Sequence, residues 1–406
     1  MEHPTVLLAL DGDAQPIVDA LTRAGMQPLV DGPSAAAHLE AGGHIDLAVL
    51  DCDLPAEQAA QTYATLHGEH TVPTLLLFGT DLPDFITGSP GGVADEYAVK
   101  PLPPDALVFR LQAQLIRGGH GLPTDGGGWT ESKSDDESAI GEGHVVAVFA
   151  PKGGVGKTTV GVNMAVAIRE QTRARVLLFD ADVGVGNVTS VLEVPYRMGL
   201  ADLADSPPSE WTDAAFEQCV ATHPGSGLRV LTWGSDPGES ELVSVDLMVA
   251  AMRWGRAHHS YVVVDTHPGY DDRTMAMLTL SNEIFLVVTP EVGALRNSAQ
   301  FLDLARQVGL GDTVRVIVNR ANHGIRTADI EEALKLPVAA TVVSNGPKAV
   351  IASNEGTPVI TKFPKDRIST DLHDVARLIT QPGPRKDESS GRRPWWAALV
   401  SRTSNA

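Results

Sequence analysis

A glycine-rich run of eight residues, 152–159, constrains the fold of this chain more than any other feature. It reads Lys-Gly-Gly-Val-Gly-Lys-Thr-Thr. The apolar segment His144–Ala150 before it predicts a buried strand, and the apolar-rich segment Val160–Ile168 after it predicts a helix. A strand, a glycine-rich loop and a helix in this order predict a phosphate-binding loop. The glycines let successive backbone N–H groups point into one concavity at the positive end of the helix.

The side chains of this loop predict nucleotide binding with a metal ion. We expect the Lys157 side chain to reach the β- and γ-phosphates and the Thr158 hydroxyl to bind Mg²⁺. The other loop residues are expected to surround the phosphates, namely Gly153, Gly154, Val155, Gly156 and Thr159. An ordinary glycine-rich turn is the alternative, and the flanking strand, the helix and the Lys-Thr pair together disfavour it.

A second lysine, Lys152, begins the run, although a chain needs only one lysine to bind its own phosphates. The form Lys-Gly-Gly-x-Gly-Lys-Thr-Thr resembles the deviant phosphate loop of the ParA/MinD ATPases. In that family the early lysine reaches the nucleotide of a second subunit across a sandwich dimer. The resemblance implies a Mg²⁺-dependent ATPase that forms a homodimer with ATP and in which Lys152 and Lys157 are catalytic.

Acidic residues end two later apolar strands. The segment Arg175–Asp182 ends in Asp180-Ala-Asp182 and is similar to the second acidic motif of the family. This resemblance implies that Asp180 supports the Mg²⁺ shell and that Asp182 orients the attacking water. In phosphoryl transfer the protein contributes mainly by positioning the reactants and by stabilising charge. The segment Ser260–Asp265 reads as a Walker B strand, so we expect Asp265 to contact Mg²⁺ through water.

The segments that follow these two strands are predicted to be nucleotide-sensing switches. Val183–Val188 follows the first strand, and Thr266–Gly269 follows the second. We expect Gly269 to sense the γ-phosphate through its backbone N–H. For His267 we favour a simple place in the second switch over acid–base chemistry, because the sequence shows no partner for it.

Two later segments suit recognition of the nucleotide base. Asn319 and Arg320 follow the predicted strand Val314–Val318, and an asparagine offers both a donor and an acceptor, which is enough to read an adenine edge. The segment Ala352–Ile360 closely resembles the part of MinD-like proteins that packs beside the adenine. That resemblance implies a contact through Pro358.

The chain divides into four parts, and its 406 residues suggest two to three domains. The ParA/MinD resemblance covers 144–380, including the family-like strand Glu283–Pro290, and implies a doubly wound α/β P-loop NTPase domain with a mostly parallel sheet. Residues 119–143 are rich in Gly, Ser, Thr, Asp and Glu and predict a flexible linker. Residues 1–118 and 381–406 are a predicted N-terminal domain and a tail.

The N-terminal part alternates strand and helix signals and predicts a small flavodoxin-like α/β domain. It resembles a response-regulator receiver domain through Asp46–Asp51 and Ala94–Pro101. Receivers place a phosphoacceptor aspartate at the end of the third strand, where Asp51 stands. They place a lysine before a proline after the fifth strand, where Lys100 stands. A generic flavodoxin-like domain is the alternative.

This domain departs from the receiver pattern in two places. Receivers carry two adjacent acids after the first strand to hold Mg²⁺, but here Leu10 precedes Asp11. They carry a Ser or Thr at the end of the fourth strand, where this chain has Phe78-Gly79 unless a shifted register brings in Thr80. Phosphotransfer needs metal to offset charge, so we predict a degenerate receiver used for docking. Phosphorylation of Asp51 is the alternative.

Charge separates the parts of the chain. The whole chain has a net charge of −20. Residues 1–118 have a net charge of −12, from four bases and sixteen acids, so a surface that binds this part is expected to be basic or neutral. The acidic body disfavours non-specific binding to nucleic acid. Residues 385–406 carry +3 and include Trp395 and Trp396. They predict an anchor at an anionic membrane surface or a docking peptide, and folding of the tryptophans onto the body is the alternative.

Cysteine and hydropathy patterns limit the compartment. The two cysteines, Cys52 and Cys219, form neither a disulfide framework nor a zinc pattern, so a reducing compartment is expected. The N-terminus does not read as a signal peptide, and no apolar run approaches the length of a membrane span. We therefore expect a cytoplasmic protein, and a peripheral position at the inner face of the membrane or at a cell pole is a further option that the tail suggests.

A receiver-like domain followed by a MinD-like ATPase is the layout of the TadZ/CpaE proteins, which position type IV (Flp/Tad) pilus machinery. The resemblance implies an ATP-dependent dimerisation switch with slow hydrolysis and with pilus-assembly or polar-localisation partners. A phosphorelay-regulated ATPase and a ParA/MinD-like ATPase for another cargo remain alternatives. A DNA-partitioning ParA is disfavoured by the negative charge, and a metal–sulfur ATPase by the lack of paired cysteines.

Overall fold

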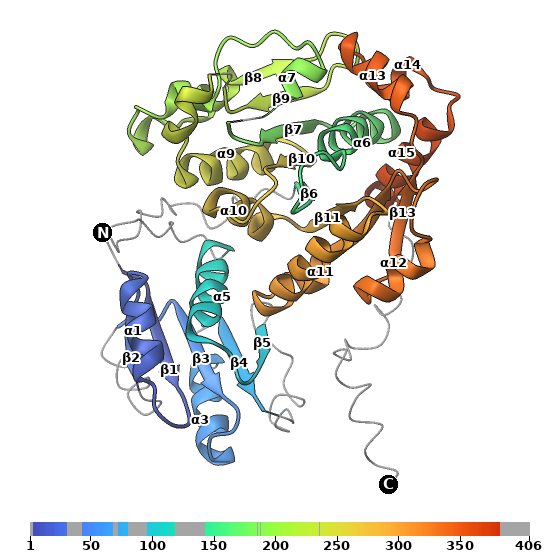
Figure 1. The fold of residues 1–406 in the computed structure, drawn as a ribbon. Coiled ribbons are helices and arrows are strands. Elements are labelled where there is room, and N and C mark those ends of the chain that lie inside the picture. Colours follow the sequence, from blue (N-terminus) through green and yellow to red (C-terminus); the bar gives the residue numbers. More distant parts are fainter. Residues whose placement is uncertain are drawn as a thin grey trace.

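A computed structural model describes residues 3–30, 43–67, 72–79, 96–117 and 143–381, with the exception of 185, 187 and 235. Thr80, the predicted linker apart from Gly143, and the predicted tail from residue 382 lie outside this set, so the predictions on them stay open. The described part forms two α/β units (Figure 1). None of its helices is both long enough and apolar enough to cross a bilayer.

The N-terminal unit is a five-stranded, all-parallel sheet in the order β2-β1-β3-β4-β5. This is the flavodoxin-like strand order; that the unit is a receiver stays a prediction. One face packs on α1 and α5, and the other packs on α3. Its elements are β1 (Thr5–Ala9), α1 (Gln15–Arg23), β2 (Gln27–Val30), β3 (Leu47–Asp51), α3 (Ala56–His67), β4 (Thr74–Phe78), β5 (Glu96–Val99) and α5 (Pro104–Arg117).

The second unit is built on an eight-stranded sheet in the order β13-β12-β11-β6-β10-β7-β9-β8. Every neighbouring pair is parallel except β8 with β9. The predicted α/β P-loop NTPase fold with a mostly parallel sheet is therefore confirmed. Its strands are β6 (His144–Phe149), β7 (Val176–Ala181), β8 (Val220–Thr222), β9 (Arg229–Thr232), β10 (Tyr261–Thr266), β11 (Glu283–Val288), β12 (Val314–Asn319) and β13 (Val338–Val342).

Helices cover both faces of this sheet, as Figure 1 shows. The α-helices are α6 (Lys157–Thr172), α7 (Val188–Val191), α8 (Asp213–Gln218), α9 (Val245–His258), α10 (Asp272–Leu280), α11 (Val292–Gln307), α12 (Thr327–Leu334), α13 (Gly346–Asn354), α14 (Val359–Lys362) and α15 (Arg367–Thr380). Short 3₁₀ helices span Leu200–Leu203, Pro208–Glu210, Pro237–Leu242 and Gly311–Thr313.

The central strand β6 explains why both faces need cover. Its side chains alternate between two buried clusters: Val145 and Phe149 face the helices α9, α10 and α11, whereas Val146 and Val148 face α6 and α15. A strand that is apolar on both faces is stable only between two helical layers. The carboxyl end of β6 thus lies mid-sheet, and the phosphate loop follows it.

The N-terminal unit contacts the second unit through α5, which packs on α10 (Figure 1). Arg110 on α5 is buried, and its guanidinium lies beside Gly309, together with the carboxylate of Glu96. Gly309 follows α11, so the contact reaches two helices of the second unit. Because α10 begins shortly after the predicted second switch, the N-terminal unit packs on the helix that follows this switch.

Candidate functional site

The phosphate loop connects the carboxyl end of β6 to the start of α6, which begins at Lys157 rather than at the expected Val160. Gly156 precedes the helix in a left-handed conformation with φ of 97°. A β-carbon there would be strained and would lie 2.3 Å from the amide nitrogen of Asn319. Only glycine suits this position, and the helix N-terminus faces the loop with unpaired N–H groups.

Two residues from the end of β12 hold the loop in shape. The Asn319 side-chain amide donates to the Val155 carbonyl at 2.8 Å, and the Arg320 guanidinium donates to the Gly154 carbonyl at 3.1 Å. The structure therefore brings Asn319 and Arg320 to the predicted site, as hydrogen-bond donors to the loop backbone. Their reading of an adenine edge stays a prediction.

Two buried carboxylates, Asp180 and Asp265, lie side by side on β7 and β10 below the loop. Burial raises the pKa of Asp265 to about 7, against the opposing effects of the Thr158 hydroxyl and the Lys157 ammonium. Burial, and then the negative charge of Asp265, raise the pKa of Asp180 well above its ordinary value. The site thus concentrates acidic groups that a cation would stabilise.

The acids and Thr158 fit the predicted Mg²⁺. Both carboxylate oxygens of Asp265 are buried, and among the described residues no donor meets them in good hydrogen-bond geometry, although the Thr158 hydroxyl is near enough to oppose the rise that burial causes in the pKa of Asp265. Within the same part of the chain, no three His, Cys, Asp or Glu side chains are grouped to hold a metal by themselves. A Mg²⁺ ion that takes most of its ligands from phosphate and water needs only such sparse protein support.

Asp180 precedes the first predicted switch, Val183–Val188, and bonds to the backbone at both of its ends. Its carboxylate accepts the backbone N–H groups of Asp182 and Val188, each at 3.3 Å. Gly186 lies so close that a β-carbon would be 2.5 Å from an Asp180 oxygen. The same acid that is predicted to support the metal therefore fixes both ends of this turn.

The second predicted switch contacts, through His267, the acid that directly precedes the first switch. The imidazole Nδ1 lies 2.7 Å from a carboxylate oxygen of Asp182, the residue predicted to orient water. The expectation that His267 has no partner was wrong, because the partner comes from a strand 85 residues earlier. An acid after β7 and a histidine after its neighbour β10 were the available signal, since parallel strands end at one edge of the sheet.

The early lysine and the second switch lie at the same edge of the loop. Lys152 pairs with Glu291 at 3.3 Å, and both side chains are about half exposed. Pro268 lies beside Gly153, and Gly269 follows it. Lys152 is therefore held on its own chain by a solvent-exposed ion pair, which contributes little stability.

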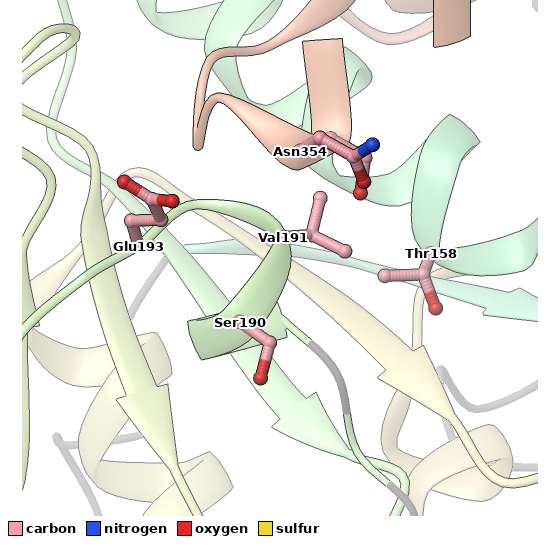
Figure 2. Close-up of a pocket in the computed structure, with 6 residues that line it drawn as sticks. Thr158, Ser190, Val191, Glu193 and Asn354 are labelled. Carbon is pink, nitrogen blue, oxygen red and sulfur yellow. The ribbon is translucent and has the colours of Figure 1, made fainter. Parts of the chain in front are cut away.

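A cavity of about 530 Å³ opens beside the start of α6, between α7 and α13 (Figure 2). Its lining is mostly polar and consists of Thr158, Ser190, Val191, Glu193, Ser353 and Asn354. The adjoining loop packs Gly356 on Glu193, and the following Pro358 is buried at the start of α14. The structure thus places Pro358 on the α7 side of the phosphate loop, whereas Asn319 lies on the β12 side; its contact with the base stays a prediction.

The N-terminal unit brings its predicted site residues together. Lys100 contacts both oxygens of the buried Asp51 at 2.7 and 2.9 Å and the Asp53 carboxylate at 2.7 Å. Burial opposes the lysine charge, but these hydrogen bonds outweigh it and raise the Lys100 pKa. Asp11 donates its backbone N–H to Asp51, and Gly79 offers no hydroxyl where receivers carry one. Phosphorylation of Asp51 stays a prediction.

Removal of the Asn319 amide is expected to loosen the phosphate loop. Asn319→Ala leaves the Val155 carbonyl without its donor, at a cost of about 1–3 kcal/mol, so Mg-ATP affinity should fall roughly tenfold or more. Calorimetric titration measures this. Asn322→Ala is the matched control, because this exposed asparagine bonds Ser344 instead of the loop. Equal affinities of the two variants would contradict the assignment.

The buried Asp265 predicts a pH-dependent stability in the absence of Mg²⁺. Its pKa rises from 3.8 to about 7 on folding, so the stability present below about pH 4 is lost as the pH rises through 7. Asp265→Asn removes the ionisable group. At about pH 8, where the buried wild-type carboxylate is charged, the variant should be more stable than the wild type by on the order of 2 kcal/mol.

Urea unfolding with chelator at about pH 5 and about pH 8 measures this difference. Asp303→Asn, at an exposed aspartate on α11, is the control that should follow the wild type. Parallel pH profiles of the wild type and Asp265→Asn would show that the carboxylate is ionised in the folded chain.

Comparison with known proteins places residues 142–380 in one family. The ParA family model, described as "NUBPL iron-transfer P-loop NTPase", matches this range. The septum site-determining protein MinD of Thermotoga maritima is 28% identical over 251 residues, which cover 59% of this chain and 89% of that protein. MinD of Bacillus subtilis is 27% identical and covers 58% of this chain and 89% of its own length.

Solved structures agree on the fold. A ParA family ATPase from Chlorobium tepidum superposes with a TM-score of 0.54 at 20% identity and covers 58% of this chain and 97% of its own. MinD from Pyrococcus horikoshii, solved with Mg-ADP, gives 0.53 at 21% identity and covers 60% and 99%. At these identities the likeness shows the fold alone. The family match spans more than half of the chain, and the chain belongs to the ParA/MinD family of P-loop NTPases.

Proposed function

We propose that the chain is a Mg²⁺-dependent ATPase that dimerises when it binds ATP and hydrolyses ATP slowly. The observation that carries this proposal is the pair of buried acids below the glycine-rich loop, beside Thr158 and Lys157. Burying two carboxylates without a counter-ion is costly, so the arrangement is best explained by a cation that arrives with the nucleotide.

The residues divide the work of hydrolysis. The loop N–H groups and Lys157 would bind the phosphates, and Thr158, Asp180 and Asp265 would hold Mg²⁺. The ion, when bound, neutralises charge that develops on the phosphoryl oxygens. Asp182 accepts a hydrogen bond from water and orients it for in-line attack. Positioning and charge neutralisation are the contributions that phosphoryl transfer requires.

Dimerisation depends on exchange of the Lys152 contact. In one chain the ammonium pairs with Glu291 at the exposed edge, a pair worth about 0–1 kcal/mol. A phosphate of a facing subunit would offer it a stronger, more desolvated partner. ATP then stabilises the dimer over the monomer, and loss of the γ-phosphate removes that preference.

Lys152→Ala should retain Mg-ATP binding and fail to dimerise, because it removes only the contact made across the dimer. Light scattering with and without ATP measures the dimer, and calorimetry measures binding. Glu291→Gln, which frees the lysine, is the matched control and should dimerise at least as well as the wild type. Lys157→Ala should lose ATP binding itself. A Lys152→Ala protein that dimerises with ATP like the wild type would exclude the sandwich arrangement.

We further propose that this ATPase positions a cargo, and that the cargo is the assembly machinery of a type IV (Flp/Tad) pilus, as in TadZ/CpaE proteins. The support is the flavodoxin-like unit that precedes the ATPase domain. In this unit Lys100 already pairs with Asp51, which favours a domain used for docking over one that is phosphorylated. A phosphorelay input through Asp51 is the second candidate. Iron transfer is disfavoured, because Cys52 and Cys219 lie in different domains and burial raises the pKa of each to about 12.

Location is the remaining proposal: the cytoplasmic face of the membrane or a cell pole, reached through Trp395, Trp396 and the nearby arginines. In pilus-bearing cells of the native organism, Lys157→Ala should abolish surface pili.

Truncation to 1–384 should move the protein from the membrane fraction to the soluble fraction. Normal piliation with Lys157→Ala, or unchanged fractionation of the truncated chain, would exclude the respective role.

A further inference from the structure

His267 lies between the two groups on which hydrolysis depends in the proposed function. On one side, its Nδ1 contacts the Asp182 carboxylate at 2.7 Å. On the other side, its ring edge covers Gly269, where a β-carbon would lie 3.3 Å from Cδ2 and 3.8 Å from Nε2. One imidazole thus contacts the predicted water-orienting acid and lies beside the predicted γ-phosphate sensor.

The chemistry of the contact fixes which atom donates. An ionised carboxylate has no proton to give, so the imidazole Nδ1–H donates and the Asp182 oxygen accepts. A hydrogen bond to a charged acceptor is stronger and more directional than a neutral one. Nδ1 is therefore the protonated ring nitrogen whenever the contact is made.

Asp182 lies close to two other acids. Burial is the main cause of the raised pKa of Asp180 and of Asp265, and the nearby charge of Asp182 adds to it. The Asp182 side chain is only 12% exposed, so a hydrogen-bond donor from the protein replaces water at its carboxylate. Its own backbone N–H is bonded to Asp180, and His267 supplies a hydrogen bond to the carboxylate itself.

We propose that His267 is a positioning residue for ATP hydrolysis: its Nδ1–H holds the Asp182 carboxylate in place and couples it to the segment that contains Gly269. This inference rests on the proposed roles of those two residues. When the γ-phosphate draws the Gly269 N–H toward itself, the imidazole moves with the same short segment and carries the carboxylate to its working position. His267 neither takes a proton from water nor binds the metal.

Substitutions that separate the donor from the ring test the proposal. His267→Asn places an amide nitrogen nearly where Nδ1 lies, whereas His267→Phe keeps an aromatic ring and loses the donor. His267→Phe should lower kcat about 10²-fold with little change in Mg-ATP affinity, since misplacement of a reacting group by about 1 Å has this effect. His267→Asn should restore most of the rate. A fully active Phe variant, or an Asn variant as slow as Phe, would overturn the proposal.

A double-mutant cycle tests whether the histidine acts through Asp182. In the Asp182→Ala background, His267→Phe should cause no further loss of rate, because the group it positions is absent. A further loss as large as in the wild type would overturn the proposal. If the wild-type chain releases no phosphate from ATP, the proposed ATPase function itself fails. The inference alone fails if the wild type and the Phe variant are equally active.

The contact also has a readout without nucleotide. Long-range ¹H–¹⁵N spectra of the nucleotide-free full chain should show the His267 proton on Nδ1, and Asp182→Ala should change that signal. His323, an exposed histidine, is an internal reference that should not respond. A neutral ring that carries its proton on Nε2 would overturn the proposal, whatever the kinetics show.

Discussion

The buried acid pair Asp180 and Asp265 is the constraint on which the rest of the site depends. The two carboxylates lie on adjacent parallel strands, sealed from water, and burial raises the pKa of both. A cation bound here would stabilise both ionised carboxylates. The phosphate loop, the start of α6 and both switch segments surround this pair, so ligand binding changes all of them together.

Contacts from distant parts of the chain give the loops their shape. Asn319 and Arg320 hold the phosphate loop from β12. Asp180 bonds backbone N–H groups at both ends of the first switch, and His267 bonds Asp182, which directly precedes that switch. Each is a hydrogen bond from a strand end to a loop. Loops held in this way have few stable arrangements, which is what a nucleotide-driven switch requires.

The N-terminal unit is placed to affect this site or to be affected by it. Its α5 packs on α10, which starts shortly after the segment that contains His267 and Gly269. A docking partner bound to the acidic N-terminal unit would therefore act on a helix only a few residues from the predicted γ-phosphate sensor. Lys100, paired with Asp51 and Asp53, keeps the unit's own buried acid neutralised without a metal.

The sequence by itself determined the central strands of the ATPase domain and the phosphate loop between β6 and α6, because apolar runs and the glycine-rich run 152–159 are local signals. Acids at strand ends predicted a metal site in the same local way, and that site stays a prediction. The sequence could not reveal the partner of His267 or the hydrogen bond from Asn319 to Val155, because these contacts join residues that are 85 and 164 positions apart. Only the order of strands in the sheet brings such segments to one edge, and that order follows from packing of the whole chain.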